Sequence, residues 1–372
     1  MAGSVHKDKK SGKWYYMLEL GTFNGKRKQK KKSGFKTKKE ASTALVEAEN
    51  EFNKGTFIEP TKSLYSDYLN DWFKGKKTKI AKQTATVYEH HINTKIIPKL
   101  GNIPLAKLTP LHLDNFVNEL VAEGLASATI KKSFEVIRSS LCYARDLEIV
   151  NRNVAEKIKL PSNPKQEMKV WNEDEFNQFI KVAKKDTSNY YIVFYLALMT
   201  GMRQGEILGL RWSDIDFENE ILIIQQTLSH DGKEFLKGGK TKSSRRSIHL
   251  STQTLETLKK HKKTILENKL KLGSAYIDFD LVCCTETGTP LNPSNIRRKL
   301  NALIKIAEVP KIRFHDLRHT HATMLLLKGV NIKVIQERLG HSNIKVTLDV
   351  YSHVLPTMQS EALKKLDSLI SI

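Results

Sequence analysis

Two periodicities mark the N-terminal segment. KWYYMLELG, which begins at Lys13, is rich in aromatic and alternating residues and predicts a β-strand. The Asn24-Gly25 pair that follows is typical of a two-residue hairpin turn. Apolar residues then recur at helical spacing in KTKKEASTALVEAENEF, where Thr37 and Glu40 are placed as a capping box. The pattern predicts a β-hairpin followed by a helix.

From Ser63 to Leu160 the spacing of apolar residues is helical throughout. Pro and Gly residues separate the stretches SLYSDYLNDWF, TATVYEHHINTKIIPKL, TPLHLDNFVNELVAEG and SATIKKSFEVIRSSLCYARDLEIV. We expect a compact domain of roughly four or five helices. Its His90-His91 pair is expected at the surface or partly in the core, because no Cys or further His lies nearby to complete a metal site.

The C-terminal part mixes both periodicities. WNEDEFNQFIKVAKK and YYIVFYLALMTGM predict helices, and RQGEILGLRW predicts a shorter one. EILIIQQTLS and SSRRSIHL predict strands, joined through the polar, Gly-rich HDGKEFLKGGKTK, and helices are expected from there to the end. This pattern is typical of a mainly α domain with a small antiparallel sheet.

Two linker-like segments, GTFIEPTKS and KLPSNPKQE, divide the chain into three predicted domains, residues 1–58, 59–164 and 165–372. The expected fold class is therefore multidomain, mainly α with small antiparallel sheets. It combines an N-terminal β-hairpin and helix, a helical middle domain and an α+β C-terminal domain.

The charge of the chain indicates a polyanionic partner. The sequence has 62 basic and 40 acidic residues, a net charge of +22, and nucleic acid is the natural partner of such a surface. The predicted hairpin is itself strongly basic, and a β-ribbon of this kind fits the DNA major groove. A solvated basic tail is the alternative, but a tail would not need the aromatic residues or the Asn-Gly turn. The candidate DNA contacts are Arg27, Lys28, Lys30, Lys31 and Lys32.

Other classes of protein fit the sequence less well. The longest apolar run, around Tyr190, is shorter than the roughly 18 residues of a membrane span, and the N-terminus does not resemble a signal peptide. No basic amphipathic helix suited to a membrane surface stands out. Three cysteines, two of them adjacent, match neither a disulfide framework nor a zinc site. We expect a soluble protein of a reducing cytoplasm.

Four short segments, called islands below, contain side chains suited to catalysis: TGMRQGEILGLRW, GGKTKSSRRSIHL, HDLRHTH and LGHSNIKVTLDVYSH. They offer lysine, arginine, histidine and one tyrosine, without the carboxylate cluster that a two-metal nuclease needs. Positive charge and fork-shaped donors instead suit the oxygens of a phosphate. The islands therefore favour a phosphoryl-transfer centre.

Other interpretations of these islands stay open at this point. His315 and His319 share one helical face with Arg318 and could bind zinc, although a third ligand is not evident. Arg203 stands at a helix start, where the dipole disfavours a cation unless an anion is held there too. GVNIKVIQERLGHSNIKVTLDVY superficially resembles a helix-turn-helix, which would suit a sequence-specific DNA-binding regulator without catalysis.

The order and spacing of the islands resemble the tyrosine recombinase, or phage integrase, family, and they share features with type IB topoisomerases. A T-G-x-R-x-x-E-x-x-x-L box, a lysine in a β-hairpin turn, an H-x-x-R box and an L-G-H triplet followed by a tyrosine define the family. The matching residues are Thr200, Gly201, Arg203, Glu206, Leu210, Lys240 or Lys242, His315, Arg318, Leu339, Gly340, His341 and Tyr351.

The resemblance implies a mechanism. Tyr351 would attack a scissile phosphate and form a 3′-phosphotyrosyl enzyme, while Arg203 and Arg318 would clamp the non-bridging oxygens. Lys240 would be the general acid, with Lys242 as the alternative, and His315 would accept a proton or donate to the phosphate. His341 would add a further hydrogen bond. Neither a metal nor a cofactor is implied.

The resemblance also implies partners and domain roles. The three domains would be an arm-type DNA-binding module, a SAM-like core-binding domain and a catalytic domain. The partners would be double-stranded DNA with core and arm attachment sites, further copies of the chain in a tetramer on DNA, and DNA-bending or excisionase helper proteins, without a membrane. The chain would integrate or excise a prophage or conjugative element in the bacterial cytoplasm, associated with the nucleoid. A topoisomerase that only relaxes DNA is the alternative enzyme.

Geometry adds one expectation for the last island. In one straight helix, His341 and Tyr351 would stand about 15 Å apart. Both must reach one phosphate, so the chain has to bend between them. Gly340 as a helix C-cap and Ser342 as a new N-cap would permit the bend.

Overall fold

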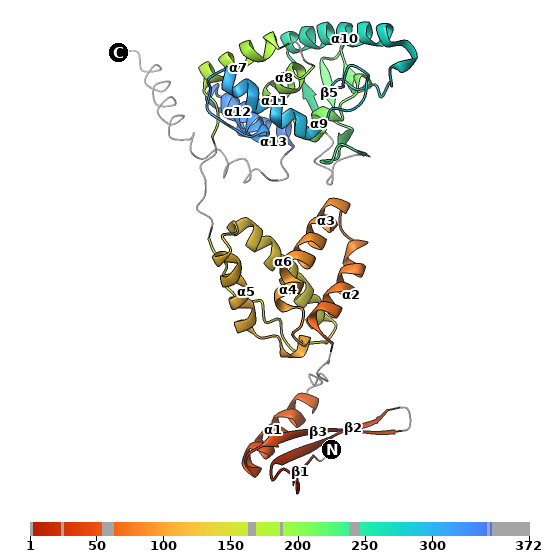
Figure 1. The fold of residues 1–372 in the computed structure, drawn as a ribbon. Helices are drawn as coiled ribbons and strands as arrows, with labels where there is room; N and C mark the ends of the chain where they lie inside the picture. Colours follow the sequence, from red (N-terminus) through yellow and green to blue (C-terminus); the bar gives the residue numbers. More distant parts are fainter. Residues whose placement is uncertain are drawn as a thin grey trace, which may run out of the picture. The chain divides into compact units, whose positions relative to one another are not determined.

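The computed structural model describes residues 3–23, 26–53, 63–162, 169–186, 189–237, 246–340 and 343. The chain forms two compact units, residues 1–165 and 166–372. Helices dominate and the sheets are small and antiparallel, which confirms the predicted fold class (Figure 1). Among the residues that the structure describes, no helix combines the length and apolar character needed to cross a lipid bilayer.

The first unit begins with a three-stranded antiparallel sheet covered by one helix. The elements are β1 (Ser4–Lys7), β2 (Trp14–Phe23), β3 (Lys26–Phe35) and α1 (Lys38–Asn53), in the strand order β1-β2-β3. Tyr16 and Leu18 of β2 pack against Leu45 of α1 and form a small core. The predicted hairpin and helix are confirmed, whereas β1 was not predicted because SVHK carries only one large apolar residue. The Asn24-Gly25 turn lies outside the described residues.

The capping box predicted at the start of α1 is present. The backbone N–H of Glu40 donates to Oγ1 of Thr37 over 3.2 Å, and the N–H of Thr37 donates to Oε2 of Glu40 over 3.4 Å. This reciprocal pair satisfies two of the N–H groups that a helix start leaves without an intrahelical acceptor.

The second part of this unit is helical, as predicted. Its elements are α2 (Tyr65–Lys77), α3 (Lys82–His91), the π-helical turn η1 (Ile92–Ile96), α4 (Ile97–Leu100), the 3₁₀ turn η2 (Leu105–Lys107), α5 (Pro110–Ala122) and α6 (Ser127–Asp146). Tyr65, Ile92 and Phe134 belong to its core. His91 is buried and its Nδ1 lies 2.7 Å from Oγ of Ser133, while His90 is exposed.

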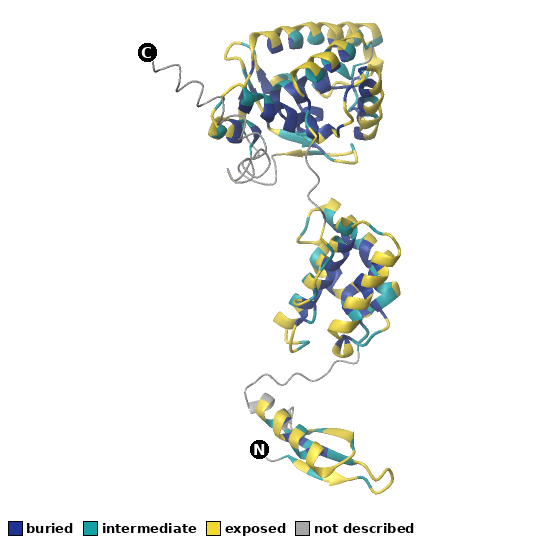
Figure 2. Ribbon diagram, turned by 90° about the vertical axis from the view of Figure 1, so that its left-hand side faces the viewer, coloured by how far each residue is buried: buried dark blue, intermediate teal, exposed yellow. Residues whose placement is uncertain are grey.

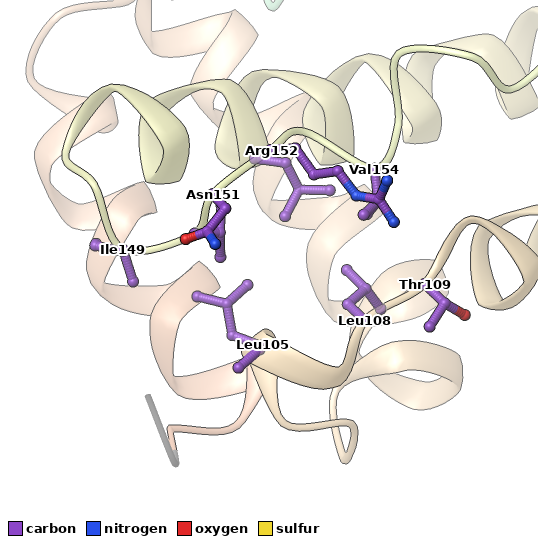
Figure 3. Close-up of a pocket in the computed structure, with 10 residues that line it drawn as sticks. Leu105, Leu108, Thr109, Ile149, Asn151, Arg152 and Val154 are labelled. Carbon is purple, nitrogen blue, oxygen red and sulfur yellow. The ribbon is translucent and has the colours of Figure 1, made fainter. Parts of the chain in front are cut away.

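A hollow of about 300 Å³ opens on this helical part (Figure 3). It lies between η2 and the segment 149–154, which follows α6. Leu105, Leu108 and Ile149 supply apolar walls, and Arg152 lies at its edge in the view. None of the residues predicted for the active site lines it.

The second unit is built around a helix that is buried on nearly all sides. Its helices are α7 (Glu173–Lys185), α8 (Tyr191–Thr200), α9 (Gln204–Leu208), α10 (Thr252–Leu272), α11 (Pro293–Ile306), α12 (Phe314–Leu327) and α13 (Ile332–Leu339). The run of buried residues from Ile192 to Leu198 makes α8 the centre of the core, and α7, α10 and α12 pack around it (Figures 1 and 2). An all-round apolar helix of this kind has to be covered on every face.

The sheet prediction for this unit is only partly right. The strands are β4 (Ile215–Asp216), β5 (Ile221–Ile223), β6 (Gln226–Leu228), β7 (Phe235–Lys237) and β8 (Ser247–His249). EILIIQQTLS forms two strands rather than one: β5 pairs with β8 as expected, but β6 pairs with β7. The strand β7 lies in HDGKEFLKGGKTK, the segment expected only to join two strands. There Ser229 closes a tight turn by accepting N–H bonds from Lys233 and Glu234.

The expectation of helices from β8 to the end is wrong between α10 and α11. After a 3₁₀ turn, Gly273–Ala275, the chain runs without helix to Pro293. Leu281 pairs with Arg211 in an isolated bridge, and the buried Val282 and Cys283 fill the core beside Leu210. Short apolar runs of this kind do not distinguish a buried bridge from a helix in sequence.

Candidate active site

Arg203 stands in a tight turn between α8 and α9. The turn begins at Gly201, whose φ of +66° lies in the left-handed region. A Cβ on Gly201 would lie 2.6 Å from Cδ2 of His321, so both conformation and space require glycine. Arg203 is the N-cap of α9, and its guanidinium Nη1 donates to Oε1 of Glu206 over 2.8 Å.

The carboxylate of Glu206 binds two arginines. It is 3% exposed and also accepts from Nη1 and Nη2 of Arg246, over 3.0 and 2.9 Å. Burial by itself raises the pKa of Glu206, but the hydrogen bonds and charges of Arg246 and Arg203 outweigh it, and the pKa is lowered. The sequence predicted an anion beside Arg203 at this helix start. The carboxylate of Glu206 supplies one such anion from within the chain, and the side chain of Arg203 remains 41% exposed.

Arg318 is buried and joins three elements. Only 2% of its surface is exposed. Its Nη1 donates to the carbonyl oxygen of Gly201 over 2.7 Å, and its Nη2 donates to that of Leu339 over 2.6 Å. Arg318 of α12 therefore holds the α8–α9 turn and the end of α13 together.

His315 and His319 lie one helical turn apart, with ring centroids separated by 4.9 Å. His315 is exposed, whereas His319 behind it is buried. Partial loss of surrounding water and the nearby Arg318 charge lower the pKa of His315, and burial lowers that of His319 to about 4. Both rings are therefore uncharged at neutral pH. Within the described residues, no cluster of three or more His, Cys, Asp or Glu is suited to hold a metal ion.

The end of α13 lies against the same arginines. Gly340 caps the helix in the left-handed conformation, with φ of +66°, as predicted. Its carbonyl oxygen lies 3.4 Å from Nη2 of Arg203. The structure thus brings Arg203 and Arg318 together at the end of α13, directly before His341. His315 lies one helical turn before Arg318, close enough to both arginines for their charges to lower its pKa. His341, Ser342 and Tyr351 themselves lie outside the described residues.

Lys240 and Lys242 also lie outside the described residues, but both flanks of their segment are described. Lys237, at the end of β7, pairs with Gln226 of β6. On the other side, Arg246 is anchored by its two bonds to Glu206. The choice between Lys240 and Lys242 therefore stays a prediction.

Sequence reasoning missed two arginines beside the site. Arg246 binds Glu206, and Arg338 donates from Nε to Nε2 of His321 and from Nη2 to the carbonyl oxygen of Met199. Burial and the Arg338 charge lower the pKa of His321 to about 3, so its ring stays neutral and keeps a lone pair for Arg338. In the sequence, Arg246 and Arg338 are distinguished only by lying next to apolar residues of a strand or a helix.

The N-terminal candidates do not share one face. In β3, Lys30 lies opposite Leu18 and Lys32 opposite Tyr16, on the face that α1 covers, whereas Lys31 lies opposite Met17 on the other face. The Nζ of Lys31 lies 3.9 Å from the ring centre of Tyr15. Arg27 and Lys28 belong to β3, but their side chains are outside the description.

Three family models match successive parts of the chain. An arm DNA-binding domain matches residues 4–52, the SAM-like N-terminal domain of phage integrases matches residues 64–121, and the phage integrase family model matches residues 169–358. The last match spans half of the chain. The chain belongs to the phage integrase family. This integrase is a tyrosine-type site-specific DNA recombinase, as the resemblance implied.

Relatives of this integrase match along most of its length. A protein of Caldanaerobacter subterraneus subsp. tengcongensis named tyrosine recombinase XerC-like is 31% identical, over 97% of each chain. The ICEBs1 integrase of Bacillus subtilis is 30% identical, over 75% of this chain and 76% of its own.

Solved structures show the same fold. The integrase of transposon Tn1549, in complex with a circular intermediate DNA, gives a TM-score of 0.69 at 19% identity, covering 82% of this integrase and 99% of that chain. A lambda integrase dimer bound to a COC′ core site gives a TM-score of 0.59 at 21% identity, covering 77% and 95%.

Proposed function

We propose that this recombinase holds a DNA phosphate between Arg203, His315 and Arg318, and transfers it to Tyr351 as a 3′-phosphotyrosyl ester. The observation that carries the proposal is the convergence of segments far apart in sequence. Arg203 and Arg318 both reach the end of α13, and Arg318 also reaches Gly201. A pair of guanidinium groups beside a neutral imidazole suits the charge that develops on phosphate oxygens during transfer.

The role of each residue follows from its chemistry. Arg203 and Arg318 stabilise the negative charge of the transition state. The phenol of Tyr351, with an ordinary pKa of about 10, must lose its proton as it attacks. His315, uncharged at neutral pH, is the proposed proton acceptor or phosphate donor.

The remaining roles concern residues that flank these elements. Lys240, or Lys242 in its place, is the proposed general acid for the departing 5′-oxygen, and His341 adds a hydrogen bond to the phosphate. Because one phosphoester replaces another at each step, bond energy is conserved and rejoining needs neither ATP nor a metal ion.

We propose further that the DNA substrate consists of attachment sites of a mobile element, which the enzyme integrates or excises. Support comes from relatives named ICEBs1 integrase and Tn1549 transposon integrase, the latter in complex with a circular intermediate DNA. Residues 1–58 would bind arm sites, residues 59–164 core sites, and residues 165–372 would catalyse. The basic strand β3 supports the first assignment, with Lys31 and Tyr15 on the sheet face away from α1.

The partners follow from the reaction. Two DNA sites must be cut and exchanged, so we propose that four copies assemble on DNA, as in a lambda integrase tetramer bound to a Holliday junction. Helper proteins that bend DNA or favour excision, and a location in the bacterial cytoplasm at the nucleoid, complete the proposal.

A nicked DNA duplex that traps the covalent intermediate tests the proposal. The wild-type chain should form a DNA–protein adduct in the presence of EDTA, and Tyr351→Phe should form none while still binding the duplex. Strand exchange between two defined duplexes should follow. A chain that binds DNA without ever forming the adduct would be a regulator, and one that relaxes DNA without exchange would be a topoisomerase.

A further inference from the structure

Arg246 lies just behind the candidate active site and links two elements of it. Its side chain is 6% exposed. Nη1 and Nη2 donate to the two carboxylate oxygens of Glu206, over 3.0 and 2.9 Å, and Nε donates to the carbonyl oxygen of Arg338 over 2.7 Å. A guanidinium held by bonds from all three of its nitrogens has a fixed plane and position.

The carboxylate of Glu206 is shared between Arg246 and Arg203. Arg203 approaches Oε1 through Nη1, over 2.8 Å, and its side chain is 41% exposed, so it can also face a ligand. With Arg246 present, the buried negative charge of Glu206 is already neutralised from the protein side. Without Arg246, Arg203 would be the nearest remaining cation for this carboxylate and would be drawn away from a phosphate.

The third bond of Arg246 belongs to a series at the end of α13. Three consecutive carbonyl oxygens, those of Arg338, Leu339 and Gly340, accept from Arg246, Arg318 and Arg203 respectively. Carbonyl groups at a helix C-terminus lack intrahelical donors and carry partial negative charge, so cations stabilise them. Three arginines from three segments therefore hold the last residues of α13 and its C-cap, Gly340.

We infer that Arg246 is a positioning residue of the recombination reaction, which holds Arg203 through Glu206 and holds the end of α13 through the carbonyl of Arg338. It does not touch the phosphate itself. The inference rests on the proposed function, because it assigns Arg203 to the phosphate. In the sequence, Arg246 also directly follows the segment that carries Lys240 and Lys242.

The test compares single-turnover adduct formation on the nicked duplex, at saturating full-length enzyme, for Arg246→Gln, Arg246→Lys and the wild type. We expect Arg246→Gln to slow adduct formation by about 10- to 100-fold, the usual effect of removing a residue that orients a reacting group. Arg246→Lys keeps the charge but loses the forked donors of the guanidinium group, and its rate of adduct formation should lie between those of the wild type and Arg246→Gln. DNA affinity should stay within about 2-fold, because phosphate contacts elsewhere dominate binding.

Arg211→Gln is the matched control. Arg211 binds the buried carboxylate of Asp214 through Nε and Nη2, over 3.1 and 2.8 Å, at the same i,i+3 spacing as Arg203 and Glu206. Its variant loses a comparable ion pair in the same unit, but we expect near wild-type adduct formation. Equal losses for Arg211→Gln and Arg246→Gln would mean that Arg246 only stabilises the fold.

A double-mutant cycle with Arg203→Ala separates positioning from general damage. If Arg246 acts through Arg203, Arg246→Gln should slow adduct formation much less in the Arg203→Ala background than in the wild type. Fully multiplicative losses, or wild-type rates for Arg246→Gln, would overturn the inference. Should Arg246→Gln fail to fold, Arg246→Lys carries the same cycle. A wild-type chain that forms no adduct would instead reject the proposed function.

Discussion

At the scale of single residues, the candidate active site is a set of arginines whose donors reach backbone carbonyl oxygens and the carboxylate of Glu206. Arg318 is the extreme case, since both of its terminal nitrogens bind carbonyl oxygens and only 2% of its surface is exposed. A buried cation is tolerated only when such dipoles replace water. Substitution by alanine would therefore disturb the fold as well as the chemistry, and lysine is the better probe.

We predict that Arg318→Lys lowers the adduct-forming rate by about 100-fold or more, because a single ammonium cannot replace the fork at the phosphate. It should also lower the free energy of unfolding by about 2 kcal/mol, since one of the two charged hydrogen bonds to carbonyls is lost. DNA affinity, measured by fluorescence anisotropy, should change little. Loss of binding in parallel with cleavage would contradict the assignment of Arg318.

Glu206 provides a pH-dependent prediction. Its pKa is lowered in the folded chain from an ordinary 4.5, so the ionised carboxylate stabilises the fold above about pH 4.5 and this contribution is lost as the pH falls through the lowered value. Glu206→Gln should reduce the free energy of unfolding by about 3 kcal/mol at pH 7. The difference from the wild type should shrink below pH 4.5, as measured by urea unfolding at several pH values.

The control for this prediction is Glu173→Gln in the same unit. Glu173 pairs with Lys328 over 2.9 Å, but both side chains are largely exposed, and such pairs contribute little. If the loss of unfolding free energy in Glu206→Gln does not vary with pH, the amide acts by disturbing the packing and not by removing the charge.

At the scale of elements, the site depends on how closely the α8–α9 turn approaches α12 and α13. Gly201 lies in that contact, between His321 of α12 and Leu339 of α13. The ring of His321 cannot move aside easily, because Nδ1 is bonded to the carbonyl of Leu198 and Nε2 accepts from Arg338. The turn, the two helices and the neutral histidine therefore form one packed junction.

We predict that Gly201→Ala lowers the free energy of unfolding by about 3 kcal/mol, from backbone strain and a clash with His321. Gly329→Ala is the matched control: Gly329 has φ of +78° in the turn before α13, but nothing lies within 4 Å of the added Cβ. Gly329→Ala should lower the free energy of unfolding by only about 1 kcal/mol. If thermal unfolding shows equal losses of stability for the two variants, backbone strain alone, and not the packing at Gly201, requires glycine in this turn.

Elements with strong local signals could be predicted from the sequence. The apolar run of α8, the capping box before α1 and Gly340 as a C-cap all follow from local chemistry, and each is confirmed. The strand β7 could not be predicted, because FLK is short and lies in a polar, Gly-rich segment. Its pairing with β6 depends on a turn around Ser229 that sequence periodicity does not reveal.

For the candidate site, motif spacing indicated Arg203, His315 and Arg318, and the structure brings these three together. The spacing gave no indication of what holds them. Arg246 and Arg338 act through long-range bonds to Glu206 and His321, and such pairings depend on the tertiary fold. For the same reason the sequence did not reveal that Glu206 supplies an anion beside Arg203.

At the scale of the whole molecule, the net charge of +22 favours binding to DNA irrespective of its sequence. Specific tasks must then come from separate surfaces. The N-terminal sheet has its own small core of Tyr16, Leu18 and Leu45, distinct from the core of the helical part around Phe134. We therefore expect each part to keep its fold when the other is removed.

We predict that a chain of residues 63–372 still forms the adduct on a core-type duplex, at a rate within about 3-fold of the full chain, because Arg203, His315 and Arg318 are unaffected. Removal of the basic strand β3 should make the salt dependence of binding to longer DNA less steep, since fewer counterions are released. Recombination between complete attachment sites should fall by about 100-fold, because two linked binding surfaces raise the effective concentration of the second site.

Lys31→Ala in the full chain distinguishes arm recognition from bulk charge. Lys31 lies on the sheet face away from α1, with its Nζ 3.9 Å from the ring centre of Tyr15, whereas Lys32 lies on the opposite face. If one sheet face reads the arm site, Lys31→Ala should weaken arm binding several-fold more than Lys32→Ala, although both remove one charge. Equal effects of the two substitutions would mean that residues 1–58 contribute charge alone. Unchanged recombination by a chain of residues 63–372 would mean that residues 1–58 have another task.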